Sequence, residues 1–290
     1  MNFQKRLSSG KFVVLAEMHT PKGVDISDLV TCSRGLKSRV DAVIVPDMDN
    51  GVMRMSALAG GSLISREGME TMIHVYTRDR NRLALQGDIL AAHVLGIHNL
   101  LVVQGVEMPL GDHKHAKPVD DLDEIELIRT IGKLQQGNDD AGFELTGKPA
   151  FGVGCAMSLW ADEGELDQEV AQTAKKVDAG AQFVVLPPMF DAGQLEGVVT
   201  RLATLKVPVI ATVFLLKSVS VARYMSLKID GIQMPESVIQ RIRKAGDRED
   251  ECLRIAGETV AAFGKLSNGV RIETMGWEHK LTTILDYAGL

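Results

Sequence analysis

The sequence is poor in aromatic residues and in cysteine. Phe, Trp and Tyr make up only 4% of its 290 residues, so the core must be built mainly from Val, Ile, Leu, Ala and Met. The three cysteines, Cys32, Cys155 and Cys252, are far apart and odd in number. This pattern fits neither a disulfide framework nor a cysteine-rich zinc or iron–sulfur site.

The sequence also lacks a basic excess and a long apolar run. Its formal net charge is −6 at pH 7, which argues against nucleic-acid binding. The longest apolar stretch, residues 207–216, is about half the length that a transmembrane helix needs. Residues 1–10 lack the apolar core of a secretory signal. We therefore expect a soluble, cytoplasmic protein without membrane insertion.

Short β-branched runs alternate with longer helical patterns along the chain. The runs predict strands over residues 12–17, 41–45, 71–75, 99–103, 150–155, 182–186, 207–213 and 269–273. They are apolar throughout rather than alternating, as expected for parallel strands covered on both faces. Helical patterns lie between them, and extra helices are predicted before the last strand, over 217–226, 237–245 and 249–263.

This order favours a single (β/α)8 TIM barrel over residues 1–290. A doubly wound open sheet is the alternative, but no Gly-x-Gly-x-x-Gly turn follows the first strand. Residues 105–121 and 135–148 are polar and predict long loops.

Active sites of such barrels lie at the carboxyl ends of the strands. Glu17 closes the first strand, where desolvation would raise the pKa of its carboxyl and suit it to general-acid catalysis. A structural ion pair of Glu17 with Lys22 or Arg54 is the alternative. His74 lies within the third strand between apolar neighbours, a setting in which histidine is more often a core residue than a ligand.

Two groups of basic residues have both a structural and a functional interpretation. Lys175 and Lys176 end the helix before the sixth strand, where the helix dipole favours lysine, or where they could reach an anionic group of a cofactor. His113 and His115 lie in a polar loop with no third ligand within reach, so no metal site is predicted.

Several long segments resemble the methylenetetrahydrofolate reductase family. They are residues 78–99, 176–181 followed by Phe190-Asp191, Pro46-Asp47 with 54–58, and 214–224. The resemblance runs over nearly the whole chain in barrel order. It implies a TIM-barrel flavoprotein in which NADH or NADPH reduces FAD, and the flavin reduces 5,10-methylenetetrahydrofolate to 5-methyltetrahydrofolate.

The resemblance also implies roles for residues at matching positions. Glu17 matches the family's general acid, although the common Glu-Phe-Phe-Pro-Pro here reads Glu17-Met-His-Thr-Pro21. His74 and the Lys175-Lys176 pair match flavin contacts. Other residues in or beside the matched segments are assigned to the cofactor (Asp47, Gln104, Gly105) and to the substrate (Phe190, Asp191).

Two departures from the family pattern leave the function open. The family's Gly-Asp after the fourth strand is Gly105-Val106 here, so the carboxylate is absent unless Glu107, assigned to the substrate site, replaces it. The family's Thr-Gln on the sixth strand is Leu186-Pro187, and proline cannot hydrogen-bond a pterin edge, which would cost about 1–3 kcal/mol if left unpaired.

These departures keep two alternatives open beside the reductase. One is a catalytic subunit that receives electrons from a partner flavin or iron–sulfur subunit and reduces a C1-pterin. The other is a non-catalytic homologue. The pterin could be tetrahydrofolate or a related carrier, and a homo-oligomer is compatible with the sequence.

Overall fold

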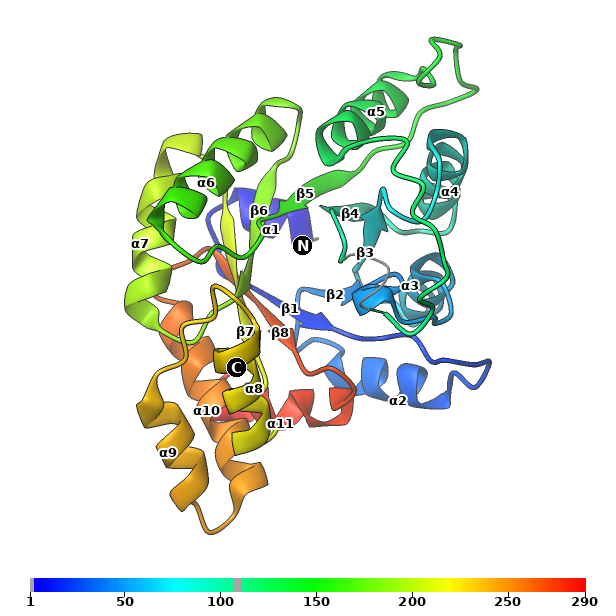
Figure 1. The fold of residues 1–290 in the computed structure, drawn as a ribbon. Coiled ribbons are helices and arrows are strands. Elements are labelled where there is room, and N and C mark those ends of the chain that lie inside the picture. Colours follow the sequence, from blue (N-terminus) through cyan, green and yellow to red (C-terminus); the bar gives the residue numbers. More distant parts are fainter. Residues whose placement is uncertain (1–2, 107–110) are drawn as a thin grey trace.

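The computed structural model describes residues 3–106 and 111–290. In these residues, eight parallel strands close into a barrel in the order β1 to β8, with helices around it (Figure 1). The strands are Val13–Glu17, Ala42–Val45, Thr71–Tyr76, Asn99–Val103, Gly152–Ala156, Phe183–Pro188, Val209–Phe214 and Gly269–Glu273. The predicted TIM barrel is confirmed, and each predicted strand overlaps an observed one.

The helices follow the strands in the expected alternation. They are α1 Phe3–Ser8, α2 Ser27–Leu36, α3 Ala57–Arg66, α4 Arg82–Val94, α5 Glu124–Gln136, α6 Glu163–Asp178, α7 Ala192–Leu202, α8 Val219–Lys228, α9 Glu236–Lys244, α10 Arg248–Phe263 and α11 Leu281–Ala288. The predicted extra helices before the last strand are confirmed as α8, α9 and α10. Within the described ranges, no helix has the length and apolar character needed to cross a membrane.

Three helices, α1, α5 and α11, were not predicted from the sequence. Helix α5 nevertheless carries a clear start signal, because the Asp123 side chain accepts the Glu126 N–H and the Glu126 carboxylate accepts the Asp123 N–H. Helix α4 is capped by the side chain of Asn81, which accepts the Ala84 N–H.

The barrel interior is filled with apolar side chains toward the amino-terminal ends of the strands. Inward-facing residues such as Leu15, Met72 and Ile210 form one buried cluster with Phe3 of α1. Phe3 packs edge-on against Phe183 at 5.5 Å between ring centroids. This packing closes the amino-terminal end of the barrel, so polar chemistry is confined to the other end.

The alternation of side chains along each strand places polar residues in the interior layer at the carboxyl ends of the strands. Because successive side chains of a strand point to opposite faces, the parity that turns Leu15 inward also turns Glu17 inward. By the same parity His74 follows Met72, and Thr212 follows Ile210. Arg271 occupies the inward position of β8, between Val270 and Ile272 of the outer core. A polar layer therefore covers the apolar one at the carboxyl ends of the strands.

Candidate functional site

Glu17 lies at the floor of the polar layer. Only 2% of its surface is exposed, and its Oε2 accepts a hydrogen bond from Arg271 Nη1 at 3.2 Å. Burial, reinforced by the nearby Glu273 carboxyl, raises the pKa of Glu17 to about 8 even though Arg271 opposes the shift. A carboxyl group with this pKa is protonated at neutral pH and can donate a proton.

The alternative that Glu17 forms an ion pair with Lys22 or Arg54 is wrong. Lys22 instead pairs with Asp112 at 2.5 Å, and Arg54 donates to the backbone carbonyl of Thr20 at 3.0 Å. The cation beside Glu17 is Arg271, which sequence reasoning did not single out.

Arg271 is held in place by three groups around its guanidinium. Its Nε donates to Thr212 Oγ1 at 3.0 Å, and its Nη2 lies 3.5 Å from Glu273 Oε2. The signal for both β8 residues was present in the sequence. The strand reads Gly-Val-Arg-Ile-Glu, with charged residues at alternate positions of a strand that is otherwise apolar.

His19 joins Glu17 to two further carboxylates. Its Nδ1 lies 3.1 Å from Glu278 Oε1, and its Nε2 lies 3.3 Å from Asp49 Oδ2 and 3.9 Å from Glu17 Oε1. Burial disfavours a charged ring, but the hydrogen bonds to Asp49 and Glu278 outweigh it and raise the pKa of His19 to about 10. The imidazole is therefore a cation in this network.

The carboxylates around His19 come from tight turns after neighbouring strands. Asp49 begins the 3-10 turn Asp49–Gly51 after β2, and Glu278 begins the turn Glu278–Lys280 after β8. Glu278 Oε1 also accepts the Gly276 N–H at 3.0 Å, and Gly276 has a φ of +92° that favours glycine. Because β8, β1 and β2 are adjacent in the barrel, these turns meet over Glu17.

His74 is buried and only half satisfied. Its Nδ1 lies 3.0 Å from the Tyr76 hydroxyl, whereas its Nε2 has no hydrogen-bond partner in the described part of the chain. Desolvation, with help from the charge of Arg271, lowers the pKa of His74 to about 3, so the ring is neutral. A buried, unpaired ring nitrogen is uncommon and marks a position where a ligand can bind.

The two lysines assigned to the cofactor lie in different environments. Lys176 is buried, and its Nζ contacts Glu124 Oε2 at 2.8 Å and the carbonyl of Ala156 at 3.0 Å. This ion pair joins α6 to α5 and to the end of β5, so a cofactor would have to compete with it. Lys175 is exposed in the last turn of α6, where the helix dipole explains it.

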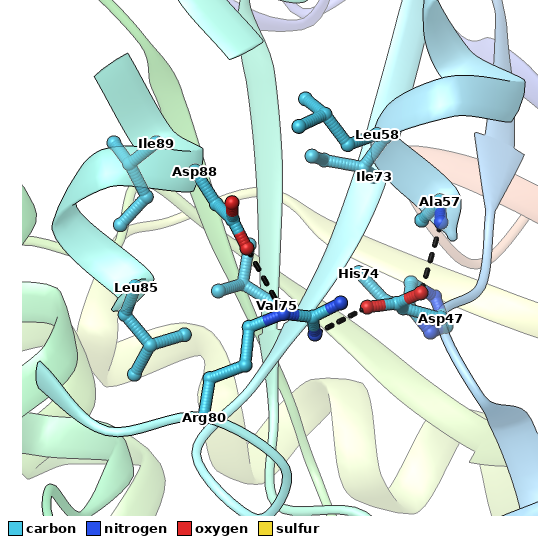
Figure 2. Close-up of a pocket in the computed structure, with 10 residues that line it drawn as sticks. All are labelled: Asp47, Ala57, Leu58, Ile73, His74, Val75, Arg80, Leu85, Asp88 and Ile89. Atoms are coloured by element: carbon cyan, nitrogen blue, oxygen red, sulfur yellow. Dashed lines mark hydrogen bonds and ion pairs between the residues drawn. The ribbon is translucent and has the colours of Figure 1, made fainter. Parts of the chain in front are cut away.

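Asp47 supports the framework beside the site. Its Oδ1 accepts the Ala57 N–H at 2.8 Å, and its Oδ2 lies 2.6 Å from Arg80 Nη1 (Figure 2). Arg80 also pairs with Asp88 at 2.9 Å, which links the loop after β3 to α4. The cavity along these residues measures about 30 Å³, enough for a water molecule but not for a cofactor.

The remaining assigned residues are spread around the strand ends. Gln104 is exposed, and Gly105 has a φ of +84° and no room for a Cβ, which would lie 2.9 Å from the Tyr76 ring. Phe190 packs against the outer core, and Asp191 caps α7. Glu107 lies outside the described residues.

The structure also locates the two departures noted in the sequence. The Val106 carbonyl accepts a hydrogen bond from Arg78 Nη1 at 2.9 Å. Pro187 is buried in β6, where the register against β7 shifts between Val185 and Pro188. Proline is tolerated at such an irregularity because it has no N–H to pair.

One group of residues in the described ranges has the spacing of metal ligands. Single ligand atoms of Glu17, His19 and Asp49 all lie within 4.8 Å of one another. The His113 ring, in contrast, is exposed and pairs with Asp112 at 2.6 Å.

Comparisons with known proteins agree with the fold and specify a family. A protein-family model described as methylenetetrahydrofolate reductase matches residues 2–289. Among solved structures, 2,3-dimethylmalate lyase, described as a PEP mutase/isocitrate lyase superfamily member, has a TM-score of 0.56 at 11% identity and covers 99% of this chain and 84% of its own. Oxaloacetate acetylhydrolase has a TM-score of 0.55 at 8% identity and covers 98% and 83%. These identities show a shared fold only. No curated protein matches the sequence.

Proposed function

The chain belongs to the methylenetetrahydrofolate reductase family, and from this premise we propose that it reduces a 5,10-methylenetetrahydrofolate-type substrate to the 5-methyl product. FAD is the proposed cofactor, and NADH or NADPH the proposed reductant. The observation that carries the proposal is the state of Glu17, whose pKa is raised to about 8 by burial at the end of β1. A non-catalytic homologue would have little use for such a group.

Glu17 performs the proton transfer that this reaction requires. Its carboxyl proton passes to the N10 nitrogen of the substrate, the bond from the methylene carbon to that nitrogen breaks, and the nitrogen keeps the bonding electrons. The carbon is then an iminium on the pterin ring and accepts a hydride. Arg271, fixed by Thr212, holds one oxygen of Glu17, so the carboxyl has a defined orientation for this transfer.

The polar layer fits a flavin at one position in particular. His74 Nε2 is buried and without a partner, so it can hydrogen-bond a ring atom of the cofactor. Because a Cβ at Gly105 would lie 2.9 Å from the Tyr76 ring, glycine lets the backbone pass close to that ring. When bound, FAD supplies the chemistry of accepting a hydride from the nicotinamide and delivering it to the iminium carbon.

Glu273 on β8 can supply a pterin contact that the family pattern implies and that this chain lacks at Val106 and Pro187. Val106 and Pro187 provide no side-chain group for the pterin, whereas Glu273 lies buried at the end of β8 with its nearest cation, Arg271, at 3.5 Å. A carboxylate in this position can accept hydrogen bonds from pterin amino groups. We therefore assign pterin recognition to Glu273.

The test separates the two half-reactions in wild-type protein and in Glu17→Gln. Heat-released cofactor is identified by its absorption spectrum and mass, flavin bleaching by NADH and NADPH is followed anaerobically, and reduction of the methylene-pterin is measured with pre-reduced enzyme. Glu17→Gln is expected to lose about 10²–10⁴-fold in the pterin half-reaction and to keep flavin reduction. Glu144→Gln, at an exposed carboxylate, is the matched control.

Other results would point to the alternatives. Pterin reduction that proceeds with an artificial reduced dye but not with NADH or NADPH indicates electron supply by a partner subunit. Equal loss of both half-reactions in Glu17→Gln contradicts the assigned role of Glu17. Wild-type protein that binds no flavin and reduces no pterin with any donor contradicts the proposed function as a whole.

A further inference from the structure

Three potential ligand atoms converge above the barrel from β1 and the segments after β1 and β2. His19 Nε2 lies 3.3 Å from Asp49 Oδ2 and 3.9 Å from Glu17 Oε1. Neighbouring ligand atoms around a cation with bonds of about 2.0–2.2 Å lie roughly 3.0–3.5 Å apart. The distance from His19 to Asp49 lies in this range, and the distance from His19 to Glu17 exceeds it by about 0.4 Å.

Two of the three side chains, His19 and Glu17, are oriented by an outer partner. Glu278 holds His19 Nδ1 at 3.1 Å, which leaves Nε2 directed at Asp49 and Glu17. Arg271 holds the other oxygen of Glu17 at 3.2 Å. A histidine that uses one ring nitrogen for a carboxylate and turns the other to a cluster of oxygens has the arrangement typical of a metal ligand.

The polar layer holds more carboxyl groups than cationic side chains. Four carboxyl groups, those of Glu17, Asp49, Glu273 and Glu278, share the layer with the guanidinium of Arg271. Their ionised forms exceed the positive charge available from Arg271 and a protonated His19. Buried charges of one sign must be neutralised by bound protons or by a metal ion.

His74 provides an independent sign of a ligand in the same layer. Its Nε2 is buried and unpaired among the described residues, and its ring interacts electrostatically with Asp49 and His19. The inward parity that β3 shows at Met72 directs it into the barrel interior. A neutral imidazole with a free nitrogen can ligate a metal or accept a hydrogen bond from metal-bound water.

We propose that Glu17, His19 and Asp49 form a binding site for one divalent transition-metal cation. One imidazole nitrogen and two carboxylate oxygens suit Zn²⁺ or Mn²⁺ better than Mg²⁺ or Ca²⁺, which prefer oxygen ligands alone. Three protein ligands leave further coordination positions for water or substrate. Coordination needs a neutral His19 and an ionised Glu17, so binding releases protons to the buffer.

The test begins with binding, measured without any activity. The chelator-treated protein is titrated with Mn²⁺ and Zn²⁺ by calorimetry, and free Mn²⁺ is followed by electron paramagnetic resonance. Wild-type protein is expected to bind one equivalent. His19→Gln and Asp49→Asn remove ligands and are expected to abolish saturable binding, and Glu278→Gln to weaken it by about 10–100-fold. His113→Gln, at an exposed histidine, is the matched control.

The outcomes separate the metal site from the proposed function. Binding to wild type and to His113→Gln, with loss in both ligand variants that melt within a few degrees of wild type, supports the site. No saturable binding to wild type, or equal binding to the ligand variants, overturns it. If metal binds as expected but no pterin is reduced with any donor, the proposed function fails while the site stands.

Discussion

We expect the free energy of unfolding to depend more on the charge of Arg271 than on that of any other side chain in the polar layer. It is the cation held between Glu17 and Glu273, and its side chain is only 11% exposed. Replacing it by methionine keeps most of the volume and leaves two carboxyl groups buried without their cation. Removing one partner of a buried ion pair costs about 3–5 kcal/mol, which corresponds to a fall in Tm of about 6–20 °C for a chain of this size.

The loss of stability in Arg271→Met should be larger at high pH than at low pH. Burial raises the pKa of Glu17 to about 8 and also raises that of Glu273, while Arg271 lowers both. Without Arg271 both pKa values rise further, so the folded variant binds more protons than the unfolded chain. Its stability is therefore retained at low pH and lost as the pH rises through the folded-state values. The difference from wild type should be larger at pH 8 than at pH 5.

Urea and thermal unfolding followed by circular dichroism, in chelator-treated protein at both pH values, measure these differences. Arg34→Met is the matched control, because Arg34 is an exposed arginine paired with Glu67 at 2.7 Å, and we expect no measurable change. An Arg271→Met variant as stable as wild type at pH 8 would refute the reasoning, as would a deficit that is greater at pH 5.

Two further predictions concern packing away from the polar layer. Gly154→Ala should destabilise the barrel by about 1–3 kcal/mol in urea unfolding, because its Cβ would lie 2.1 Å from the Phe183 ring, whereas Gly132→Ala in open space on α5 should stabilise slightly. Equal effects of the two would contradict the packing argument. Lys176→Met should destabilise by about 3–5 kcal/mol because it leaves Glu124 buried without its cation, and adding Glu124→Gln should recover much of that loss. A double variant no more stable than Lys176→Met would show that the ion pair is not the cause.

The sequence predicted the barrel because its strands are covered on both faces and therefore read as continuous apolar runs. Because these runs are almost entirely apolar, they did not indicate a polar layer at the carboxyl ends of the strands. In the run 269–273 the residues Arg271 and Glu273 break the apolar pattern at alternate positions, and strand parity could have placed both in the barrel interior. His74 could have been placed beside them by the same rule, since it lies two residues after Met72.

The network around His19 could not be derived from spacing. Its carboxylate partners are Asp49 and Glu278, and the second is 259 residues away in the sequence. The contact exists only because the barrel closes between β8 and β1, which brings the last strand's turn over the first strand's end. The ion pair of Lys176 could not be predicted either. Its partner Glu124 belongs to α5, and this helix was not predicted from the sequence.

Closure of the barrel also determines which side of the site carries the carboxyl groups. Val106 follows β4, and in a closed eight-strand barrel β4 lies opposite β8. A carboxylate after β4, which the family resemblance implies and Val106 replaces, would therefore lie across the barrel from Glu273. The carboxyl groups of Glu273, Glu278 and Asp49 lie instead on the β8, β1 and β2 side, around Glu17. This grouping accounts for the buried Arg271 and the charged His19, because carboxylates gathered on one side of a barrel need cations in the same layer.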